Sequence, residues 1–456
     1  MAGIGFELRK LLKRDSYFSL LQTYAYAGII SSVPWILSII AVLVIGIISV
    51  PVVIPAVLVS QFQTCITYLI ALSLIYTGLM QLAFTRYSAD RIFEKEHFRL
   101  LPNLNGLLLI VTTLGGIVAF PLVLCLFPET SIIFRLLFAT TFVVLSCVWV
   151  AAILLSGLKA YKAILINFAL GYGTALILSI FLRVWKLDGL MLAFLTGQFV
   201  LLKGMLFVIF RNYPSRNFIE FDFIKPNRIH VSLILTGLFY NLGIWIDKFV
   251  FWFHPFTGSN VIGPLRASEI YDLPIFLAYL SILPGMAVFL VRMETDFVEF
   301  YDRYYDAVRE GGSLSHIQQM KDEMVRMARE GIYDIIKVQA IATITVFLAG
   351  RTLLEMAGIS IVYLPLLYID VVGAGLQVVF LGIINIYFYL DRRGRALSLT
   401  ALFAGLNGIL SAFSIFMGPY FYGYGFAGSL CITILCGMFL LDRDLESLEY
   451  KTFMLQ

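Results

Sequence analysis

The stretch YNLGIWIDKFVFWF, residues 240–253, lies near the middle of the chain, inside an apolar run from Val231 to Phe253. That run is long enough to cross a bilayer as a helix, which takes about 20 residues. Asp247 and Lys248 nevertheless stand well inside it. Ionisable side chains in a spanning helix are costly and usually face a water-filled cavity or a partner group. Because sequence neighbours point about 100° apart on a helix, these two are predicted to be poor partners for each other and to need water or another helix.

The polar and aromatic residues of this stretch fall on two neighbouring faces of the predicted helix. One face carries Asn241, Trp245, Lys248 and Trp252, and the next carries Tyr240, Ile244, Asp247 and Phe251. Such a stripe suits a carbohydrate path, because polar groups bind sugar hydroxyls and aromatic rings pack on sugar C–H surfaces. The alternative is a structural ion pair between helices.

The composition is that of a polytopic membrane protein. Of the 456 residues, 60% are hydrophobic and 14% are charged, whereas a soluble domain averages about 25% charged residues. Twelve apolar runs have about the length of one membrane crossing and are predicted to span the bilayer. They are residues 23–47, 56–80, 107–127, 132–155, 163–182 and 190–210, then 231–253, 270–291, 333–349, 362–390, 397–416 and 425–441.

These runs predict an all-α integral membrane protein of about 12 transmembrane helices, in two pseudo-symmetric six-helix lobes around a central cavity. The predicted parts are an N-lobe at 21–210, a linker at 211–230, a C-lobe at 231–441 and a tail at 442–456. Residues 1–20 are basic and amphipathic, which is typical of a helix lying on the cytoplasmic membrane surface.

The positive charges are distributed unequally between the two sides of the membrane. If the N-terminus is cytoplasmic, 26 of the 33 Lys and Arg residues lie on the cytoplasmic side and five on the outer side. Lys203 and Lys248 lie within runs. Because cytoplasmic loops carry an excess of Lys and Arg, both termini are predicted to be cytoplasmic.

The longest cytoplasmic loop, residues 292–332, is predicted to form a helical hairpin. Its first part is acidic and aromatic, Gly311–Gly312 interrupts it, and Ser315 fits a capping box that opens a second helix ending near Arg329. The candidate residues for docking a cytosolic partner are Phe297, Tyr301, Tyr304, Tyr305, Met320 and Met324. The alternative is a hairpin that packs on its own transmembrane ends.

Four ionisable residues are candidates for coupling transport to a cation or proton: Arg266, Glu269, Asp272 and Asp370. The first three stand at the outer entry to the eighth run, where Glu269 is predicted to share a helix face with the other two. The alternative there is a solvated helix start with an Arg–Glu pair. Asp370 lies within the tenth run, and its side chain is too short to reach the membrane surface. It is a candidate proton or cation site, or the partner of Lys248.

The first apolar run is polar at its start and is the expected counterpart of the seventh run across the cavity. Tyr26 and Trp35 are therefore added to the predicted substrate path. Pro34 in this run, and Pro274 and Pro284 in the eighth, are predicted to kink their helices and are candidate hinges.

Signals of catalysis are poor. The chain has no Walker A motif and no dinucleotide fingerprint, and its four histidines show no metal-ligand spacing. A D-x-D at Asp442–Asp444 caps the last run without a nucleotide-binding fold around it. No catalytic residue, cofactor or metal is therefore predicted.

Three strings carry a family resemblance: MAGIGFELRKLL at residues 1–12, YAGIISS at 26–32 before Pro34-Trp35, and NLGIWIDK at 241–248. They resemble the PelG family of Pel exopolysaccharide transporters, and length, span number and cytoplasmic termini agree with that family. The resemblance implies a member of the multidrug/oligosaccharidyl-lipid/polysaccharide (MOP) flippase superfamily, in the inner membrane of a bacterium.

The resemblance also implies a substrate and partners. The chain would carry a galactosamine-rich polymer outward from a cytosolic glycosyltransferase that uses a UDP-sugar, together with other membrane subunits, one of them a cyclic di-GMP receptor. Its partners would be this polysaccharide, those proteins and the lipid bilayer, with no nucleic acid. Deacetylation would follow export, so the passing chain would be largely neutral.

Two other functions remain open at the level of sequence. One is a cation-coupled carrier of drugs or lipid-linked oligosaccharides, which needs a titratable coupling site. The other is a membrane scaffold that recruits the glycosyltransferase, in which case the hairpin matters and the cavity does not.

Overall fold

The computed structural model describes residues 17–450 apart from 159, 227 and 229. Helices make up nearly all of the described chain, which also holds one two-stranded antiparallel sheet. The predicted all-α membrane fold is confirmed. The predicted surface helix lies outside the described residues, except for 17–20, which begin the first helix. Residues 451–456 of the predicted tail also lie outside them.

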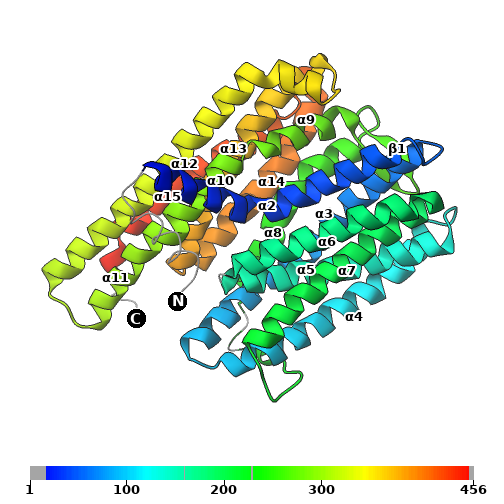
Figure 1. Cartoon of the computed structure of the whole chain (residues 1–456). Coiled ribbons are helices and arrows are strands. Elements are labelled where there is room, and N and C mark those ends of the chain that lie inside the picture. The colour runs from blue at the N-terminus through cyan, green and yellow to red at the C-terminus, as the bar shows by residue number, and fades with distance from the viewer. Residues whose placement is uncertain (1–16, 159, 227, 229, 451–456) are drawn as a thin grey trace. The chain divides into compact units, whose positions relative to one another are not determined.

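The first part of the chain is built of long helices joined by short turns (Figure 1). They are α2 (Tyr17–Ser49), α3 (Val57–Phe93), η1 (His97–Arg99), α4 (Leu100–Leu126), α5 (Ile132–Gly157), α6 (Tyr161–Leu182), η2 (Arg183–Trp185), α7 (Lys186–Asn212), η3 (Asp222–Ile224) and α8 (Val231–Phe253).

A β-hairpin follows α8 and leads into the remaining helices. These elements are β1 (Ser259–Ile262), β2 (Leu265–Ala267), α9 (Glu269–Leu280), α10 (Leu283–Val291), the π-helix η4 (Arg292–Phe297), α11 (Val298–Arg309), α12 (Leu314–Met356), η5 (Ile361–Tyr363), α13 (Leu364–Tyr389), α14 (Arg393–Met417), η6 (Pro419–Phe421) and α15 (Tyr424–Glu446).

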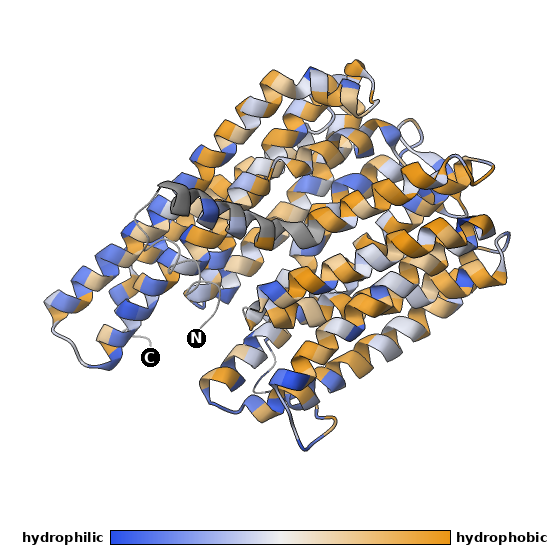
Figure 2. Ribbon diagram, viewed as in Figure 1, coloured by the Kyte–Doolittle hydropathy of each residue, from blue (hydrophilic) through white to orange (hydrophobic). Residues whose placement is uncertain are grey.

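Each predicted apolar run lies in one helix, to within a residue at its ends, with two exceptions. The eighth lies in the pair α9 and α10, and the tenth begins in η5 and continues through α13. Among the described residues, nine helices are long and apolar enough to cross a membrane, or ten if a bent pair is one crossing. That count takes Tyr161–Asn212, which holds both α6 and α7, as one stretch. Figure 2 shows the apolar length of these helices and the hydrophilic residues gathered on α11 and the start of α12.

The chain divides into two compact units. The 33–245 unit contains residues 33–245 and 252–268, and the 269–456 unit contains residues 269–456 with the segments 1–32 and 246–251. Most of α8 therefore belongs with the helices before it, and one turn belongs with those after it. The predicted lobes, divided at residues 211–230, assign α8 differently and stay a prediction.

Glycines let the helices of the 33–245 unit approach closely. In this unit α5 packs on α3, α4 and α7, and α7 packs on α6 (Figure 1). A Cβ at Gly197 of α7 would lie 2.5 Å from the carbonyl oxygen of Gly171 in α6. A Cβ at Gly237 of α8 would lie 2.2 Å from the carbonyl oxygen of Gly78 in α3. Small residues of this kind drive close helix packing in membranes, where no hydrophobic force joins helices.

The eighth span is broken between α9 and α10, with a bend of 43°. The break comes directly before Pro284, which fits the predicted kink there, whereas Pro274 lies inside α9. Pro34 lies inside α2, which continues past it.

Gln339 of α12 closes this break. Its Nε2 donates a hydrogen bond of 3.1 Å to the carbonyl oxygen of Ser281. Two glycines make room for this side chain: a Cβ at Gly285 would lie 2.3 Å from its Oε1, and a Cβ at Gly375 would lie 2.6 Å from its Cγ. A backbone group freed by the break is thus satisfied inside the protein, as membrane burial requires.

The loop at residues 292–332 differs from the prediction in two respects. The N-cap of α12 is Ser313, whose hydroxyl accepts from the backbone N–H of His316 at 3.4 Å, so the capping box at Ser315 is wrong. The second helix does not end near Arg329 but continues to Met356, because nothing after Arg329 interrupts the helical pattern. One helix of 43 residues therefore holds both the arm of the hairpin and the ninth apolar run.

Half of the predicted docking residues are interior. Phe297, Tyr304 and Met324 are fully buried, and Phe297 packs on Tyr389 with the ring centroids 5.7 Å apart. The prediction that these three form a docking surface is wrong, because their side chains fill the space where the hairpin packs on its own transmembrane ends. Three others, Tyr301, Tyr305 and Met320, are half-buried, and their role in docking stays a prediction.

The link at residues 211–230 is fastened to the start of α4. The amide oxygen of the fully buried Asn103 accepts from the backbone N–H of Asp222 at 2.7 Å, and its amide nitrogen donates to the Glu220 carboxylate at 3.3 Å. A Cβ at Gly106 would lie 2.2 Å from the carbonyl oxygen of Glu220, so only glycine allows this contact. This part of the link is therefore packed structure and no flexible tether.

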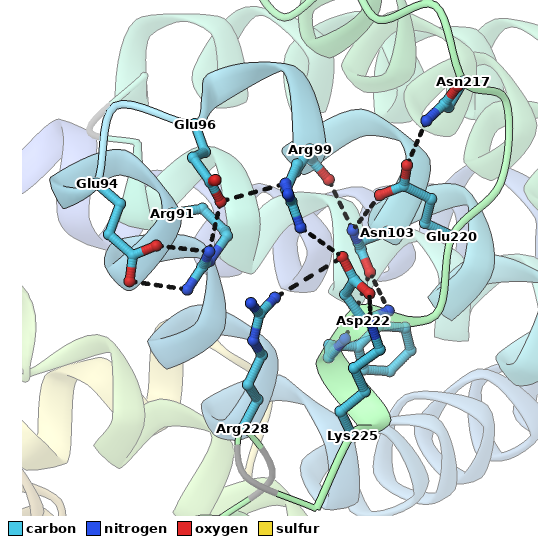
Figure 3. Close-up of polar contacts among 11 residues, drawn as sticks. Arg91, Glu94, Glu96, Arg99, Asn103, Asn217, Glu220, Asp222, Lys225 and Arg228 are labelled. Atoms are coloured by element: carbon cyan, nitrogen blue, oxygen red, sulfur yellow. Dashed lines mark hydrogen bonds and ion pairs between the residues drawn. The ribbon is translucent and has the colours of Figure 1, made fainter.

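The Asp222 side chain lies at the centre of a cluster of ion pairs (Figure 3). Arg99 Nη1 lies 3.0 Å and Arg228 Nη1 3.7 Å from Asp222 Oδ2, and Lys225 Nζ contacts Oδ1. The hydrogen bond from Lys225, with the charges of the three cations, holds the pKa of the Asp222 carboxyl below its usual value of 3.8, although burial opposes this.

We predict that ionised Asp222 stabilises the fold. Its pKa is lower in the folded than in the unfolded chain, so this stabilisation is present above about pH 4 and is lost as pH falls through the folded-state pKa. Asp222→Asn should lower the thermal unfolding midpoint near pH 7, and the gap to the parent protein should close in acid. The control is Asp90→Asn, whose pair with Arg86 has side chains 41% and 37% exposed. Equal losses in both variants, or a gap independent of pH, would contradict the prediction.

Candidate functional site

Asp247 and Lys248 form a buried ion pair in the 269–456 unit, to which their turn of α8 belongs. Lys248 Nζ donates to the two carboxylate oxygens of Asp247 at 3.2 and 3.0 Å. The prediction that these neighbours are poor partners is wrong. The long Lys248 side chain can fold back along the helix, and its ammonium meets the carboxylate where groups from other helices bind both.

Tyrosine and asparagine side chains complete the pair. The Tyr271 hydroxyl of α9 donates to Asp247 Oδ2 at 2.7 Å, and the Asn407 amide of α14 donates to Oδ1 at 3.4 Å. Lys248 Nζ also donates to the Tyr279 hydroxyl at 3.4 Å. A buried charge pair is tolerated when further hydrogen bonds satisfy it, and here those bonds come from α9 and α14. Ser411 in turn donates to the Asn407 amide oxygen at 2.9 Å.

Aromatic rings enclose the same site. Phe251 stacks on Tyr271 with the ring centroids 3.9 Å apart and the planes 5° apart. The Lys248 ammonium lies 5.2 Å from the ring centroid of Tyr279 and 5.1 Å from that of Phe426. Ring faces attract a cation at such distances. The arrangement therefore combines hydrogen-bonding groups with ring faces.

Asp370 of α13 lies in the same unit and is fully buried. Neither of its carboxyl oxygens has a hydrogen-bond partner among the described residues, but it lies within electrostatic range of Lys248 and Asp247. A Cβ at Gly423 (φ +83°), directly before α15, would lie 2.7 Å from Asp370 Oδ1. The start of a helix carries partial positive charge, which favours a carboxylate there. The hydrogen-bonded partner of Lys248 is thus Asp247, and Asp370 is the group left without a donor.

The remaining predicted residues of α8 belong to the 33–245 unit. Asn241 is half-buried and donates to the carbonyl oxygen of Gly237 at 2.9 Å. Trp252 is buried and lies 4.5 Å from the ring centroid of Tyr68, so it packs the interior of the unit and does not line an open path. Trp245 is half-buried, with its ring 6.4 Å from Trp252. Tyr240 is also half-buried.

Arg266 is placed differently from the prediction. It lies in β2, where its guanidinium donates to the carbonyl oxygen of Gly258 at 2.7 Å. The predicted helix face shared by Arg266 and Glu269 is wrong, because α9 begins only at Glu269 and the preceding residues form the β-hairpin. Glu269 is exposed and Asp272 half-buried, both in the first turn of α9.

The predicted residues of α2 are less fully described. Tyr26 is half-buried and belongs to the 269–456 unit. The Trp35 side chain lies outside the described part of the structure.

Sequence reasoning missed three members of the buried site: Tyr271, Tyr279 and Asn407. A signal for them exists in the spacing. Tyr271 and Tyr279 are about two helical turns apart and therefore share a face, and Asn407 and Ser411 are one turn apart in an otherwise apolar run. Polar groups on one face of a spanning helix indicate a partner on another helix.

The acidic groups do not form a metal centre within the described residues, where no three His, Cys, Asp or Glu side chains could hold an ion. The D-x-D near the C-terminus is engaged in ion pairs: Asp442 contacts Arg329, and the buried Asp444 accepts from Arg395 at 3.2 Å.

Comparison with known families decides the class of the protein. The family described as "PelG: Putative exopolysaccharide Exporter (EPS-E)" matches residues 1–453. The chain belongs to the PelG family. The resemblance seen in the three sequence strings is thereby confirmed over nearly the whole chain.

Solved structures show the fold of this PelG-family chain. A MOP superfamily transporter from Pyrococcus furiosus, whose binding pocket is described as having reverse polarity, aligns with TM-score 0.62 and 14% identity, over 93% of this chain and 96% of the other. A multidrug resistance MATE family transporter in an outward-facing conformation aligns with TM-score 0.65 and 13% identity, with the same coverage. An inward-facing one gives TM-score 0.59 and 13% identity, over 91% and 95%.

These matches establish a multi-pass membrane protein with the MOP transporter fold, in an exporter family and not an enzyme family. None of the curated proteins compared with the chain matches it.

We predict strong energetic coupling between Asp247 and Lys248. Removing one partner of a buried pair leaves the other charge unpaired and costs about 3–5 kcal/mol. Asp247→Asn and Lys248→Met should each lower the free energy of unfolding by about this amount in SDS titrations of mixed micelles, and the double variant should lose less than the sum.

The control for this cycle is the surface pair of Asp391 and Arg393, whose side chains are 46% and 24% exposed and which also makes two contacts, at 2.7 and 2.8 Å. Exposed pairs contribute about 0–1 kcal/mol, so Asp391→Asn should cost little. Additive losses at Asp247 and Lys248 would mean that the pair contributes no coupling.

Proposed function

We propose that the chain moves an exopolysaccharide of the Pel type, rich in amino sugars, across the bacterial inner membrane. The polymer enters from a cytosolic glycosyltransferase and leaves on the outer side. The observation that carries this proposal is the match of an exopolysaccharide exporter family to residues 1–453, on a chain with the MOP transporter fold. Both termini are cytoplasmic in this proposal, as the distribution of Lys and Arg favours.

The chemistry of the α8 region supports a sugar chain as cargo. Asn241 and Trp245 are half-buried and can contact a ligand without unfolding of the helix. The turn that follows them holds Asp247 and Lys248 as a neutral pair. A largely neutral polymer is bound by hydroxyl-binding and aromatic groups. A binding site with a strong net charge would bind such a polymer no more tightly.

Partners belong to the same proposal. The glycosyltransferase and other membrane subunits, including a cyclic di-GMP receptor, would dock at the cytoplasmic side. The exposed face of the α11–α12 hairpin is the surface we assign to them, with Tyr301, Tyr305 and Met320 at its half-buried edge.

Vesicle reconstitution tests the proposal. The chain and its glycosyltransferase are placed in sealed vesicles, UDP-sugar is supplied on the cytoplasmic face, and the fraction of polymer protected from added glycosidase is measured. Protection should require this chain and should fall with Trp245→Ala and Asp247→Asn at equal protein levels. Phe413→Ala, a 58% exposed position on α14, is the control and should leave protection unchanged. Normal protection in both α8 variants would refute the α8 path, and full synthesis with no protection would refute translocation.

Asp370 favours a second candidate, transport coupled to a proton or cation. Asp247 and Asp370 supply two carboxylates to the buried site and Lys248 supplies one ammonium. With all three ionised, these groups carry a net negative charge inside the membrane, which is costly unless a proton or cation is bound. The cargo would then be a drug or a lipid-linked oligosaccharide, or the polymer itself driven by a gradient.

We predict that Asp370→Asn separates the two candidates. In a coupled carrier, collapsing the proton and sodium gradients across the vesicles should stop transport, and Asp370→Asn should remove that dependence. Glu269→Gln, at an exposed carboxylate, is the control. In a translocase driven by polymer synthesis, neither the ionophores nor Asp370→Asn should change the protected fraction.

A further inference from the structure

A cavity of about 740 Å³ lies at one end of the 33–245 unit, and none of the candidate-site residues described above lines it. Ligand sites in proteins usually have volumes of about 300–1,000 Å³, so it is large enough for a short sugar segment. Its lining comes from the start of α3, the turn between α4 and α5, the turn between α6 and α7, and β1 with the residue after it. On the orientation proposed above, it opens on the outer side.

The walls of the cavity are held by specific contacts. Gln61 of α3 donates to the carbonyl oxygen of Val261 in β1 at 3.0 Å. The hairpin turns at Gly263 (φ +52°), where a Cβ would lie 2.7 Å from the ring of Phe127, so a side chain there would collide with the α4 wall. The cavity is therefore part of a fixed frame.

A second contact joins two walls. The Ser131 hydroxyl, at the start of α5, donates to the two carboxylate oxygens of Asp188 in α7 at 3.0 and 2.9 Å. The same hydroxyl accepts from the backbone N–H of Phe134 at 3.0 Å. Asp188 thus positions the wall and leaves the other polar groups of the cavity to contact a ligand.

The exposed lining combines an aromatic face with charged groups of both signs. The Trp185 side chain is 63% exposed, although it lines a cavity and has polar neighbours. Lys186 follows it with the unusual φ of +55°, and Glu129 faces the cavity from the opposite turn. Both Lys186 and Glu129 are exposed. With Asp188, the lining holds two carboxylates and one ammonium.

We propose that this cavity binds a short segment of a neutral or amino-sugar chain, a use that rests on the proposed export function. The Trp185 ring would pack on a sugar face, and Glu129 and Lys186 would hydrogen-bond hydroxyl and amine or amide groups. Two carboxylates against one ammonium disfavour anionic polymers and phosphate headgroups and favour a protonated amine. The site receives the chain where it leaves the membrane.

Trp residues are also enriched at membrane surfaces, where they anchor proteins in the lipid. Anchoring would explain the exposure of Trp185 alone. It would not require a cavity beside the ring that is fixed by Gln61 and Gly263, nor charges of both signs in its lining. The test therefore separates sugar binding from lipid contact.

The test uses the full chain in lipid nanodiscs, titrated with a tetramer of N-acetylgalactosamine and with its partly de-N-acetylated form. Trp185→Ala should weaken binding about tenfold, the loss expected for a central aromatic contact. Phe181→Ala is the matched control, because Phe181 is 70% exposed on α6 and does not line the cavity. Glu129→Gln should reduce the preference for the de-N-acetylated tetramer about two- to fivefold, the scale of an exposed charge contact.

Three results would overturn the inference: no binding of either tetramer, equal affinities in the parent protein and Trp185→Ala, or an effect of Trp185→Ala confined to nanodiscs rich in anionic lipid. Failure here is distinguishable from failure of the proposed function. Export by a protein that binds no tetramer would refute this site alone. Tetramer binding sensitive to Trp185→Ala, in a protein that exports no polymer, would support the site and refute the function.

Discussion

A buried ion pair sets the conditions that the surrounding helices must meet. Lys248 and Asp247 lie within an apolar helix of the 269–456 unit, with the carboxylate fully buried. Desolvating two such charges costs several kcal/mol each, which their attraction offsets only with further hydrogen bonds. Those bonds come from Tyr271, Tyr279 and Asn407, on helices that must therefore pack against α8. Since the pair is satisfied, Asp370 is the acidic group left without a donor among the described residues.

Close approach of neighbouring backbones at glycines is the second condition. Gly423, with its positive φ, and Gly425 begin α15 where a Cβ would collide with Ile369 or Ser411, so α13 and α14 close around the buried site. In the 33–245 unit, Gly106 allows the link to lie on α4 through Asn103. Packing of this kind replaces the hydrophobic force that joins helices in water.

The sequence predicted the spans well because each must be apolar over about 20 residues, a property that reads directly from the chain. It singled out Asp247, Lys248 and Asp370, all of which are buried, because charges in such runs are rare. It failed on their pairing, since the direction of a Cβ does not tell where a long lysine side chain ends. It also missed Tyr271 and Asn407, because the partner of a polar side chain depends on which helix packs against it.

The hairpin errors have a similar cause. Ser313 and Ser315 both suit an N-cap, and only the contact with the backbone N–H of His316 distinguishes them. The aromatic residues of α11 suit a core as well as a surface, and burial assigned Phe297 and Tyr304 to the core.

Photo-crosslinking during polymer synthesis would show whether a sugar chain passes beside α8. A photoreactive phenylalanine analogue replaces Trp245, and the same analogue replaces Phe439, which is 70% exposed on α15. Polymer is made in vesicles from labelled UDP-sugar under illumination. Labelled glycan should become attached to the chain at position 245 and not at position 439. Lipid adducts alone at position 245, while polymer is exported at the normal rate, would contradict a path beside α8.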